Sequence, residues 1–269
     1  MTAGDKLFSG SIAEIYDRFM VPLIFEPYAR DLANRVARLG PQRVLEVAAG
    51  TGVVTRALAA QLPSGAAIVA TDLNQPMLDH ARKTLNEDPR IEWRQADALT
   101  LPFGDAQFDA VVCQFGAMFF PDKERGCREA KRVLKPGGRF LFNVWDRIAE
   151  NDFANVVTEA LAKLFPSDPP RFMARTPHGY CDQDLIRAEL AAARFGTISI
   201  DAVNAVSRAP SAHAVAVAYC QGTPMRNEIE SRGGGLEEAT RHADEALQAR
   251  FGHGEVAGRI RAFVITASS

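Results

Sequence analysis

Two glycines and two aspartates have the residue types and spacing needed to hold a nucleotide-like ligand. Gly50 and Gly52 follow a short apolar run, and because glycine has no Cβ, the backbone there can turn sharply and approach a ligand closely. A helical pattern begins directly afterwards, so its unpaired N–H groups would face that ligand. Asp72 ends the next apolar run, where a carboxylate can accept hydrogen bonds from both ribose hydroxyls. Asp97 follows a third run. Turn formation is the alternative role for both aspartates, and for Asp97 the two roles can coexist.

The elements that must position these residues alternate between strands and helices. A short apolar run predicts each strand, and apolar residues at helical spacing predict the helices between them. This alternation is typical of a parallel α/β sheet, whose ligands bind at the carboxyl ends of the strands. The predicted strands are residues 43–47, 66–72, 91–95, 108–115 and 139–145.

Two kinds of nucleotide site share the order of strand, glycine turn and helix. The dinucleotide fingerprint requires G-x-G-x-x-G, and the corresponding residues here, Ala48, Gly50 and Val53, match it poorly. The segment 46–52 reads E-x-A-x-G-x-G instead. It resembles motif I of the class I S-adenosylmethionine-dependent methyltransferases, with Ala48 in place of the first glycine. We expect that extra methyl to be tolerated if φ is negative at residue 48.

Two later segments resemble the same family. Residues 97–103 read D-A-L-T-L-P-F, as in the loop that family members place at the adenine edge. Residues 134–138 read L-K-P-G-G, a turn expected before the fifth strand. These two segments occur together with motif I, the acidic residue after the second strand and the apolar fourth strand. Because all five features appear in order, residues 40–146 resemble the type 11 methyltransferases. These include the C-methyltransferases of quinone biosynthesis.

The resemblance implies a fold, a cofactor and a binding site. The fold is a Rossmann-like, doubly wound α/β sheet of seven strands in the order 3-2-1-4-5-7-6, with the last strand antiparallel. The cofactor is S-adenosyl-L-methionine, which leaves as S-adenosyl-L-homocysteine. The implied cofactor-binding residues are Tyr16, Glu46, Ala48, Ala49, Gly50, Gly52, Asp72, Leu73, Met77, Asp97, Ala98, Gln114 and Phe115.

The flanking segments define the predicted organisation of a single domain. Residues 1–40 contain a capping box at Ser11 and two helices, which in the family often close over the cofactor. Residues 41–146 form the cofactor-binding core, and residues 258–269 contain the last strand, predicted at 259–267. Between them, residues 147–257 hold helices at 151–165, 182–193, 212–221 and 236–251 and the sixth strand at 197–203. The last two helices form an inserted cap that either covers the acceptor or makes a dimer contact. Gly233–Gly235 is a predicted flexible joint.

Composition excludes several classes of protein. With 31 Lys+Arg against 33 Asp+Glu among 269 residues, the formal charge of −2 gives no electrostatic reason to expect a nucleic-acid partner. The four cysteines are widely spaced, which predicts neither a metal site nor a disulfide framework and fits a cytoplasmic protein. We find no signal sequence and no run long enough to span a membrane.

Methyl transfer from a sulfonium is an in-line displacement, so the protein chiefly aligns the nucleophile and excludes water. The apolar, aromatic segment 115–120 favours a small apolar or aromatic acceptor, and the acceptor atom is O, N or C. A general base is needed only if the acceptor arrives protonated, and the candidates are His178, Tyr180 and His213, each also explained as a loop or surface residue. The alternative functions are a non-catalytic relative of the family, supported by Ala48, and a nicotinamide-dependent oxidoreductase.

Overall fold

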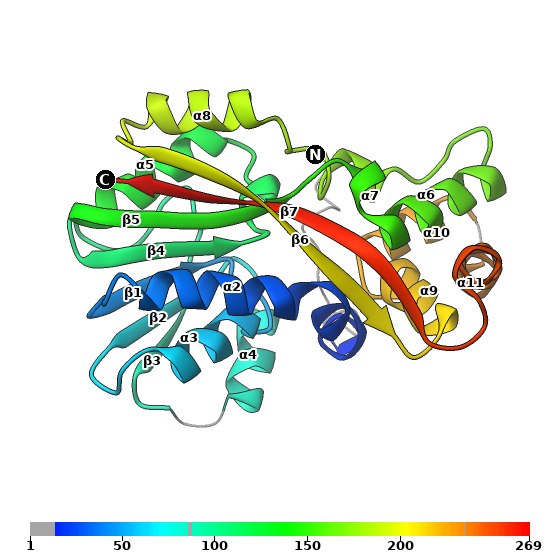
Figure 1. Ribbon diagram of the computed structural model, residues 1–269, viewed down its shortest axis with the longest axis horizontal. Helices are drawn as coiled ribbons and strands as arrows, with labels where there is room; N and C mark the ends of the chain where they lie inside the picture. Colours follow the sequence, from blue (N-terminus) through cyan, green and yellow to red (C-terminus); the bar gives the residue numbers. More distant parts are fainter. Residues whose placement is uncertain (1–13, 86–87, 234) are drawn as a thin grey trace. The chain divides into compact units, whose positions relative to one another are not determined.

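The computed structural model describes residues 14–85, 88–233 and 235–269. These residues form two compact units, each of which draws on several stretches of the chain (Figure 1). We call residues Glu26–Val144, Cys181–Ala202 and Phe263–Ser269 the sheet unit. The helical unit consists of residues 14–25, Trp145–Tyr180 and Val203–Ala262.

Five parallel strands form the centre of the sheet, as predicted from the apolar runs. Four of them consist almost entirely of buried residues, because helices cover both faces of a parallel sheet. The fifth, β3, lies at the edge and is largely exposed. The strands are β1 (Arg43–Val47), β2 (Ala67–Asp72), β3 (Ile91–Gln95), β4 (Phe108–Gln114) and β5 (Leu134–Trp145).

The complete sheet has seven strands in the order β3-β2-β1-β4-β5-β7-β6, with β7 antiparallel, which confirms the predicted topology. Both late strands are longer than predicted: β6 is Ile198–Ala209 and β7 is Val256–Ser268. Their additional residues include Asn204, Arg208 and Gly258, which have low strand propensity. Hydrogen bonding between the neighbouring strands β6 and β7 overrides the low strand propensity of these residues.

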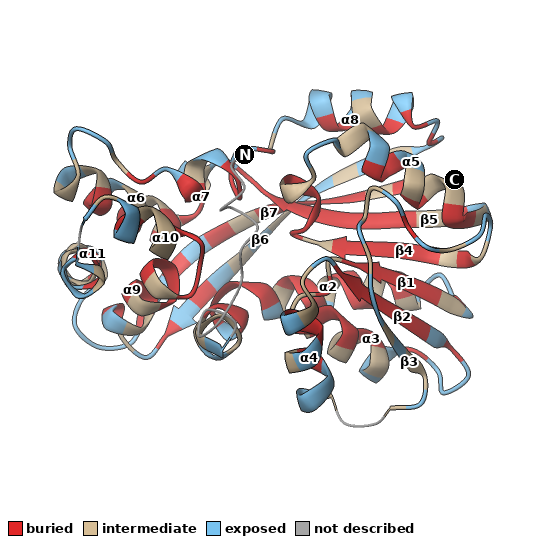
Figure 2. Cartoon of the chain, turned by 180° about the vertical axis from the view of Figure 1, so that it is seen from behind, coloured by how far each residue is buried: buried red, intermediate tan, exposed pale blue. Residues whose placement is uncertain are grey.

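The helices of the sheet unit pack in groups. Figure 1 shows α2 beside α3 on one face of the sheet, and Figure 2 shows α5 with α8 on the other. Their apolar residues point inward, and the buried residues of α2, for example, include Tyr28, Leu32 and Val36, as predicted. The helices are α2 (Glu26–Ala37), α3 (Val53–Gln61), α4 (Gln75–Thr84), α5 (Lys123–Val133) and α8 (Gln183–Ala192).

The L-K-P-G-G segment differs from its predicted role as a turn before the fifth strand. Strand β5 already begins at Leu134, which pairs with Phe108, and the next paired residue of β5 is Arg139, opposite Ala110. The residues between them bulge out of the ladder, and Gly137 has a φ of 78°. The proline and glycines therefore produce an irregularity within the strand rather than a reversal that precedes it.

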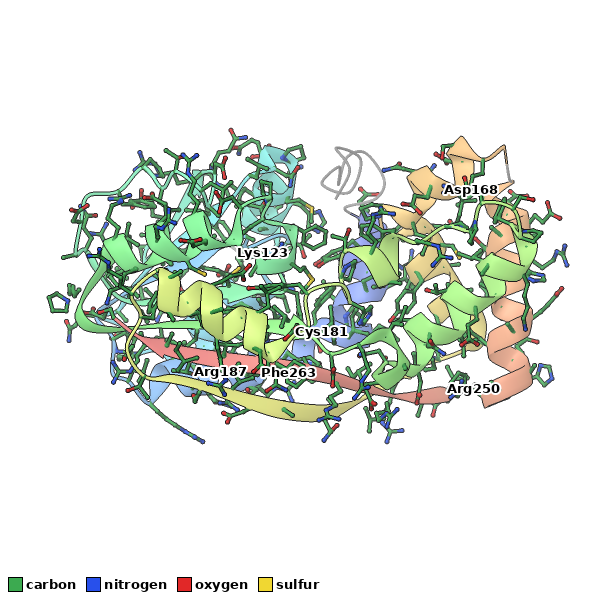
Figure 3. The ribbon with its side chains drawn as sticks, turned by 90° about the horizontal axis from the view of Figure 1, so that it is seen from above. Lys123, Asp168, Cys181, Arg187, Arg250 and Phe263 are labelled. Carbon is green, nitrogen blue, oxygen red and sulfur yellow. The ribbon has the colours of Figure 1, made fainter. Side chains whose placement is uncertain are left out.

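The helical unit contains α6 (Asp152–Leu164), α7 (Phe172–Arg175), α9 (Ala212–Gln221), α10 (Met225–Ser231) and α11 (Leu236–Phe251). Helices α6, α9 and α11 are confirmed, whereas α7 and α10 are too short to show a clear helical period. Residues Tyr16–Phe25 form a π-helix instead of the predicted α-helix; Pro22 within it has no N–H to donate. Figure 3 labels Arg250 in α11, whose guanidinium pairs with Asp152 of α6 at 3.6 Å.

Some predictions fall outside the described residues. These are the capping box that begins at Ser11 and the central glycine of the predicted joint, Gly234. The division of the chain into functional segments at residues 40, 146 and 257 stays a prediction. Among the described residues, we find no helix that is both long and apolar enough to cross a bilayer.

Candidate cofactor site

The loop after β1 has an unusual backbone. Ala48, Gly50 and Gly52 all have positive φ, at 57°, 57° and 80°. The N–H of Ala49 donates to the carbonyl oxygen of Thr71 at the end of β2 (2.9 Å), which holds the loop against the sheet. Gly52 then caps α3, so the first N–H groups of this helix point toward the carboxyl edge of the sheet. Such a loop and helix start form a site for an acceptor-rich ligand.

Ala48 does not satisfy the condition under which its methyl group was expected to be tolerated. Its φ of 57° is in the left-handed region, where a Cβ is unfavourable by about 1–2 kcal/mol. The methyl group has room because residue 116 is glycine. A Cβ built on Gly116 would lie 2.5 Å from the Cβ of Ala48. The condition of a negative φ is therefore not met, and a glycine on a neighbouring strand end accommodates the methyl group.

Asp72 holds the same loop from the end of β2. Its Oδ2 accepts a hydrogen bond from the N–H of Gly50 (2.8 Å), and its Oδ1 accepts one from the N–H of Asn74 (2.8 Å). Burial raises the pKa of this carboxyl, while the two backbone donors act in the opposite direction. A carboxylate has about four acceptor positions, and because the side-chain amide of Asn74 takes a third one, a position on Oδ2 remains for a ribose hydroxyl.

Asn74 supports Asp72 rather than capping α4 with its side chain. It precedes α4, but its side chain accepts no hydrogen bond from the helix. Its Nδ2 instead donates to Oδ1 of Asp72 at 3.3 Å. Asn74 therefore supports the carboxylate as well as marking the start of the helix.

The predicted apolar cofactor contacts lie beside Asp72. Leu73 is 46% exposed, one of the few large apolar side chains at the surface, and it directly follows the carboxylate. Met77 is buried, with its Cε 3.8 Å from the position of a Cβ on Gly50. The hydroxyl oxygen of Thr51, in the same loop, is enclosed and has no hydrogen-bond partner among the described residues. An exposed leucine, an unpaired hydroxyl and one remaining acceptor position on the Asp72 carboxylate fit an adenosyl ligand at this edge.

Asp97 forms a turn after β3. Its Oδ1 accepts from the N–H of Leu99 (2.9 Å), and the N–H of Thr100 donates to its carbonyl oxygen (3.0 Å). The side chain is exposed, so its second carboxylate oxygen stays available to a ligand. Ala98, the next residue, is half-buried. The structure thus shows the turn role and leaves the adenine role open as a prediction.

Gln114 is the last residue of β4 and Phe115 follows it. The buried side-chain amide of Asn143 holds both residues in place. The N–H of Phe115 donates to both the carbonyl oxygen and Oδ1 of Asn143, at 3.1 Å each. Nδ2 of Asn143 lies 3.5 Å from Oε1 of Gln114. Phe115 has a φ of 49°, and Tyr28 packs edge-on against its ring at 5.4 Å. Sequence reasoning missed Asn143, although a polar residue inside the apolar strand β5 was a usable signal.

Glu46 lies inside the sheet unit near the end of β1. Its Oε2 accepts a hydrogen bond from the hydroxyl of Thr55 in α3 (2.6 Å). Burial raises the pKa of Glu46 to about 8, and the nearby charge of Asp72 acts in the same direction. Glu46 therefore links β1 to the helix that begins at the glycine loop.

The remaining candidates, Tyr16, His178, Tyr180 and His213, belong to the helical unit. Nδ1 of His178 lies 2.8 Å from the carbonyl oxygen of Asp146, and both His178 and Tyr180 are buried. His213 is 65% exposed, and its Nδ1 lies 3.2 Å from Oδ2 of Asp244 on α11, which fits the predicted alternative of a surface residue. The ring of Tyr16 lies 5.2 Å from that of Phe25. The part of the chain that the structure describes contains no cluster of side chains suited to a metal ion.

Comparisons with known proteins identify the family of the chain. The sequence profile of one family, described as a methyltransferase domain, matches residues 45–142. The demethylmenaquinone methyltransferase of Clavibacter sepedonicus is 36% identical over 172 residues, which cover 61% of this chain and 69% of that protein. The ubiquinone/menaquinone biosynthesis C-methyltransferase UbiE of Pseudomonas aeruginosa is 29% identical over 207 residues, or 72% of this chain and 76% of that protein.

A solved structure shares the fold. The crystal structure of the YcgJ protein of Bacillus subtilis matches with a TM-score of 0.57 at 20% identity, covering 90% of this chain and 98% of that one. At this identity the likeness concerns the fold alone. The matched domain and the identity to the Clavibacter enzyme show that the chain belongs to the class I S-adenosylmethionine-dependent methyltransferases of type 11.

Proposed function

We propose that this methyltransferase transfers the methyl group of S-adenosylmethionine to a small aromatic acceptor at the carboxyl edge of its sheet. In this proposal Asp72 binds the ribose, Leu73 and Met77 lie beside the adenine, and Asp97 and the N–H of Ala98 bind its edge. The methionine part lies along the loop after β1, next to Gln114 and Phe115. Tyr16, which belongs to the helical unit, stays a predicted contact of the cofactor.

The observation that carries the donor site is the bond between Asp72 and Gly50. This hydrogen bond of 2.8 Å joins the carboxylate that we propose to bind the ribose to the glycine loop. One buried side chain therefore positions both the ribose-binding part and the methionine-binding part of the proposed site. The remaining acceptor position of Asp72 and the exposed side chain of Leu73 then lie at the same edge.

Two observations support an aromatic acceptor. The chain leaves β4 through an apolar segment in which Phe115, Ala117 and Met118 are buried and Phe119 is half-buried. Two relatives are named for methylation in quinone biosynthesis. Burial of Met118 also confirms that part of this segment belongs to the core. Alignment of acceptor and methyl group supplies most of the acceleration in such a displacement.

The experiment that tests this proposal uses 1,4-dihydroxynaphthalene, kept reduced, as the acceptor. Purified protein with S-adenosylmethionine is expected to form S-adenosylhomocysteine and a naphthalene product that carries one added methyl group, both detected by mass spectrometry. Release of S-adenosylhomocysteine that does not depend on the naphthalene, or no release at all, would contradict the proposed acceptor class. The cytoplasmic location, the homodimer and the lack of a nucleic-acid partner stay predictions.

A further inference from the structure

Helix α5 holds the segment after β3 with a row of charged side chains. Arg125, Glu129 and Arg132 follow one another at helical spacing, so they project from one face of the helix. All three bond to residues of segment 97–103, and the helix and the segment belong to the same sheet unit. This charged face of α5 therefore has a definite partner, which is the D-A-L-T-L-P-F segment.

Glu129 and Arg132 fix the second half of this segment. Oε2 of Glu129 accepts a hydrogen bond from the N–H of Leu101 (2.7 Å). Nη2 and Nη1 of Arg132 donate to the carbonyl oxygens of Leu101 (3.0 Å) and Phe103 (2.7 Å). The two charged side chains also pair with each other at 2.8 Å. Because the bonds to the segment involve backbone atoms, they set the path of the chain after the turn at Asp97.

Arg125 is the member of the row that reaches the turn itself. Its Nε donates to the carbonyl oxygen of Leu99 (2.8 Å), and its Nη2 donates to the hydroxyl of Thr100 (2.7 Å). Its own backbone is anchored, because its N–H donates to Oδ1 of Asp122, the N-cap of α5 (2.9 Å). The planar guanidinium presents its donors in a fixed geometry, so the two bonds together hold the turn in one orientation.

The turn that Arg125 holds contains the two groups that we propose to bind the adenine edge. The N–H of Leu99 donates to Oδ1 of Asp97 (2.9 Å), and the N–H of Thr100 donates to the carbonyl oxygen of Asp97 (3.0 Å). Arg125 therefore binds the same two residues whose N–H groups orient Asp97. The carboxylate of Asp97 and the N–H of Ala98 are thus held at a fixed spacing.

The spacing of these two groups matters for the identity of the base. A carboxylate only accepts hydrogen bonds, and a backbone N–H only donates them. The edge of adenine offers the complementary pair, an amino group at C6 and an acceptor at N1. Hypoxanthine differs from adenine only at this edge, where it has a carbonyl oxygen at C6 and an N–H at N1. Its acceptor would face the carboxylate and its donor would face the N–H, so a rigid turn rejects it.

We propose that Arg125 is a positioning residue that enables the enzyme to distinguish adenine from hypoxanthine in its cofactor; this rests on the proposed function above. Arg125 acts through the turn rather than by contact with the base. It keeps Asp97 and Ala98 in the arrangement that matches adenine. Without the guanidinium the turn relaxes, so it binds adenine less well and discriminates less against the wrong base.

The variant Arg125→Met tests the proposal, because methionine has a long unbranched side chain and no hydrogen-bond donor. Calorimetric titration compares S-adenosylhomocysteine with S-inosylhomocysteine, which carries hypoxanthine. The native protein should bind the adenosyl ligand about 100-fold more tightly, since each of two hydrogen bonds contributes roughly 10-fold. Arg125→Met should reduce this ratio by about 3- to 10-fold, because it weakens the adenosyl ligand and leaves the inosyl ligand unchanged.

Two further variants serve as controls. Arg128→Met removes the same charge from the same helix, but the guanidinium of Arg128 pairs with Glu124 of that helix, so both affinities should stay unchanged. Arg125→Lys keeps the charge and can keep one of the two bonds to the turn, so it should give a ratio between those of the native protein and Arg125→Met.

A second readout needs no ligand. Hydrogen exchange of the backbone N–H groups of Leu99 and Thr100, measured by NMR, reports how often the turn opens. Exchange at both residues should be about 3-fold faster or more in Arg125→Met than in the native protein, and unchanged in Arg128→Met.

Three results would overturn the proposal: equal weakening of both ligands by Arg125→Met, an unchanged ratio, or unchanged exchange at Leu99 and Thr100. Equal affinity of the native protein for the two ligands would overturn it as well, because the turn would then not read the base. Failure of the native protein to bind either ligand would instead contradict the proposed function itself.

Discussion

At the scale of single residues, Asp72 combines a structural and a proposed binding role. Its two carboxylate oxygens accept the N–H groups of Gly50 and Asn74, so it fixes the glycine loop before any ligand arrives. The sequence predicts a carboxylate at this strand end, since the spacing from Gly52 is that of a ribose-binding acid. The bond to Gly50 was not predictable, because it depends on how the loop curls back toward the next strand.

Glu46 provides a prediction about pH. The pKa of its carboxyl is about 8 in the folded protein, raised by burial, against a usual value of 4.5 in the unfolded chain. Between these values the unfolded chain is ionised and the folded protein is not, so unfolding releases a proton. The stability associated with Glu46 is therefore complete below about pH 4.5 and is lost as the pH rises to about 8. We expect Glu46→Gln, which keeps an acceptor for Thr55, to remove this loss.

Urea unfolding of both proteins at about pH 5, 6.5 and 8 measures the effect. At each increase in pH, the free energy of unfolding of the native protein should fall relative to that of Glu46→Gln. Glu129 is the matched control, because its bonds to Arg132 lower the pKa of its carboxyl. For Glu129→Gln the difference should stay constant from about pH 5 to 8, because a carboxyl with a lowered pKa is ionised in both the folded and the unfolded state there. Parallel pH profiles of the native protein and Glu46→Gln would show that Glu46 is ionised in the folded state.

At the scale of secondary-structure elements, the ends of β1 and β4 depend on each other. Ala48 follows β1 with a φ of 57°, and Gly116 follows β4 with no side chain to oppose the alanine methyl group. A Cβ at residue 116 would also lie 2.8 Å from Sγ of Cys113. The two strand ends therefore pack against each other beneath the loop that we propose to bind the methionine part of the cofactor.

A double-mutant cycle tests this dependence. We expect Gly116→Ala to destabilise the protein by about 1–3 kcal/mol, the usual effect of overpacking. Ala48→Gly should be neutral or stabilising, because glycine adopts a positive φ without strain. In the double variant the Gly116→Ala loss should shrink by about 0.5–2 kcal/mol, since only the contact with Cys113 remains. Gly65→Ala, where a Cβ meets no atom within 4 Å, is the control. Additive effects would contradict direct contact between the two strand ends.

How well each strand could be predicted depends on whether its own residues or its neighbours determine its structure. The strands β1 to β4 were predicted to within a residue, and for β1, β2 and β4 the reason is that burial on both faces requires nearly continuous apolar runs. The start of β5 was missed, since Pro136 and two glycines normally interrupt a strand and here bulge out of it. The length of β6 was missed too, because partner strands can impose pairing on residues of low propensity.

At the scale of the whole molecule, the methyltransferase family was predictable from the sequence, whereas the surroundings of His178, one of the candidate bases, were not. The family follows from short motifs in the right order, each with a local physical reason. Nδ1 of the buried His178 lies 2.8 Å from the carbonyl oxygen of Asp146, 32 residues earlier in the chain, and no local sequence pattern predicts such a contact. A buried histidine in a loop has the same sequence appearance as a surface one.

Ligand-dependent melting tests the cofactor class on the intact protein. A ligand that binds only the folded state adds about 2.7 kcal/mol at a hundred times its Kd. For a chain of this size such an addition raises the Tm by about 5 °C or more. S-adenosylmethionine and S-adenosylhomocysteine should both raise the Tm, whereas NAD should not. A shift with NAD alone would support the oxidoreductase alternative.

The central claim is that Asp72 organises the cofactor site, and calorimetric titration of S-adenosylmethionine tests it most directly. Asp72→Asn is compared with Asp109→Asn, since Asp109 likewise accepts two backbone N–H groups, from Gln42 and Arg43, but at the opposite end of β1. We predict that Asp72→Asn weakens binding by about 10-fold or more, the equivalent of at least one lost charged hydrogen bond. Asp109→Asn should lower stability and leave the affinity unchanged. Equal affinities of the native protein and Asp72→Asn would contradict the account.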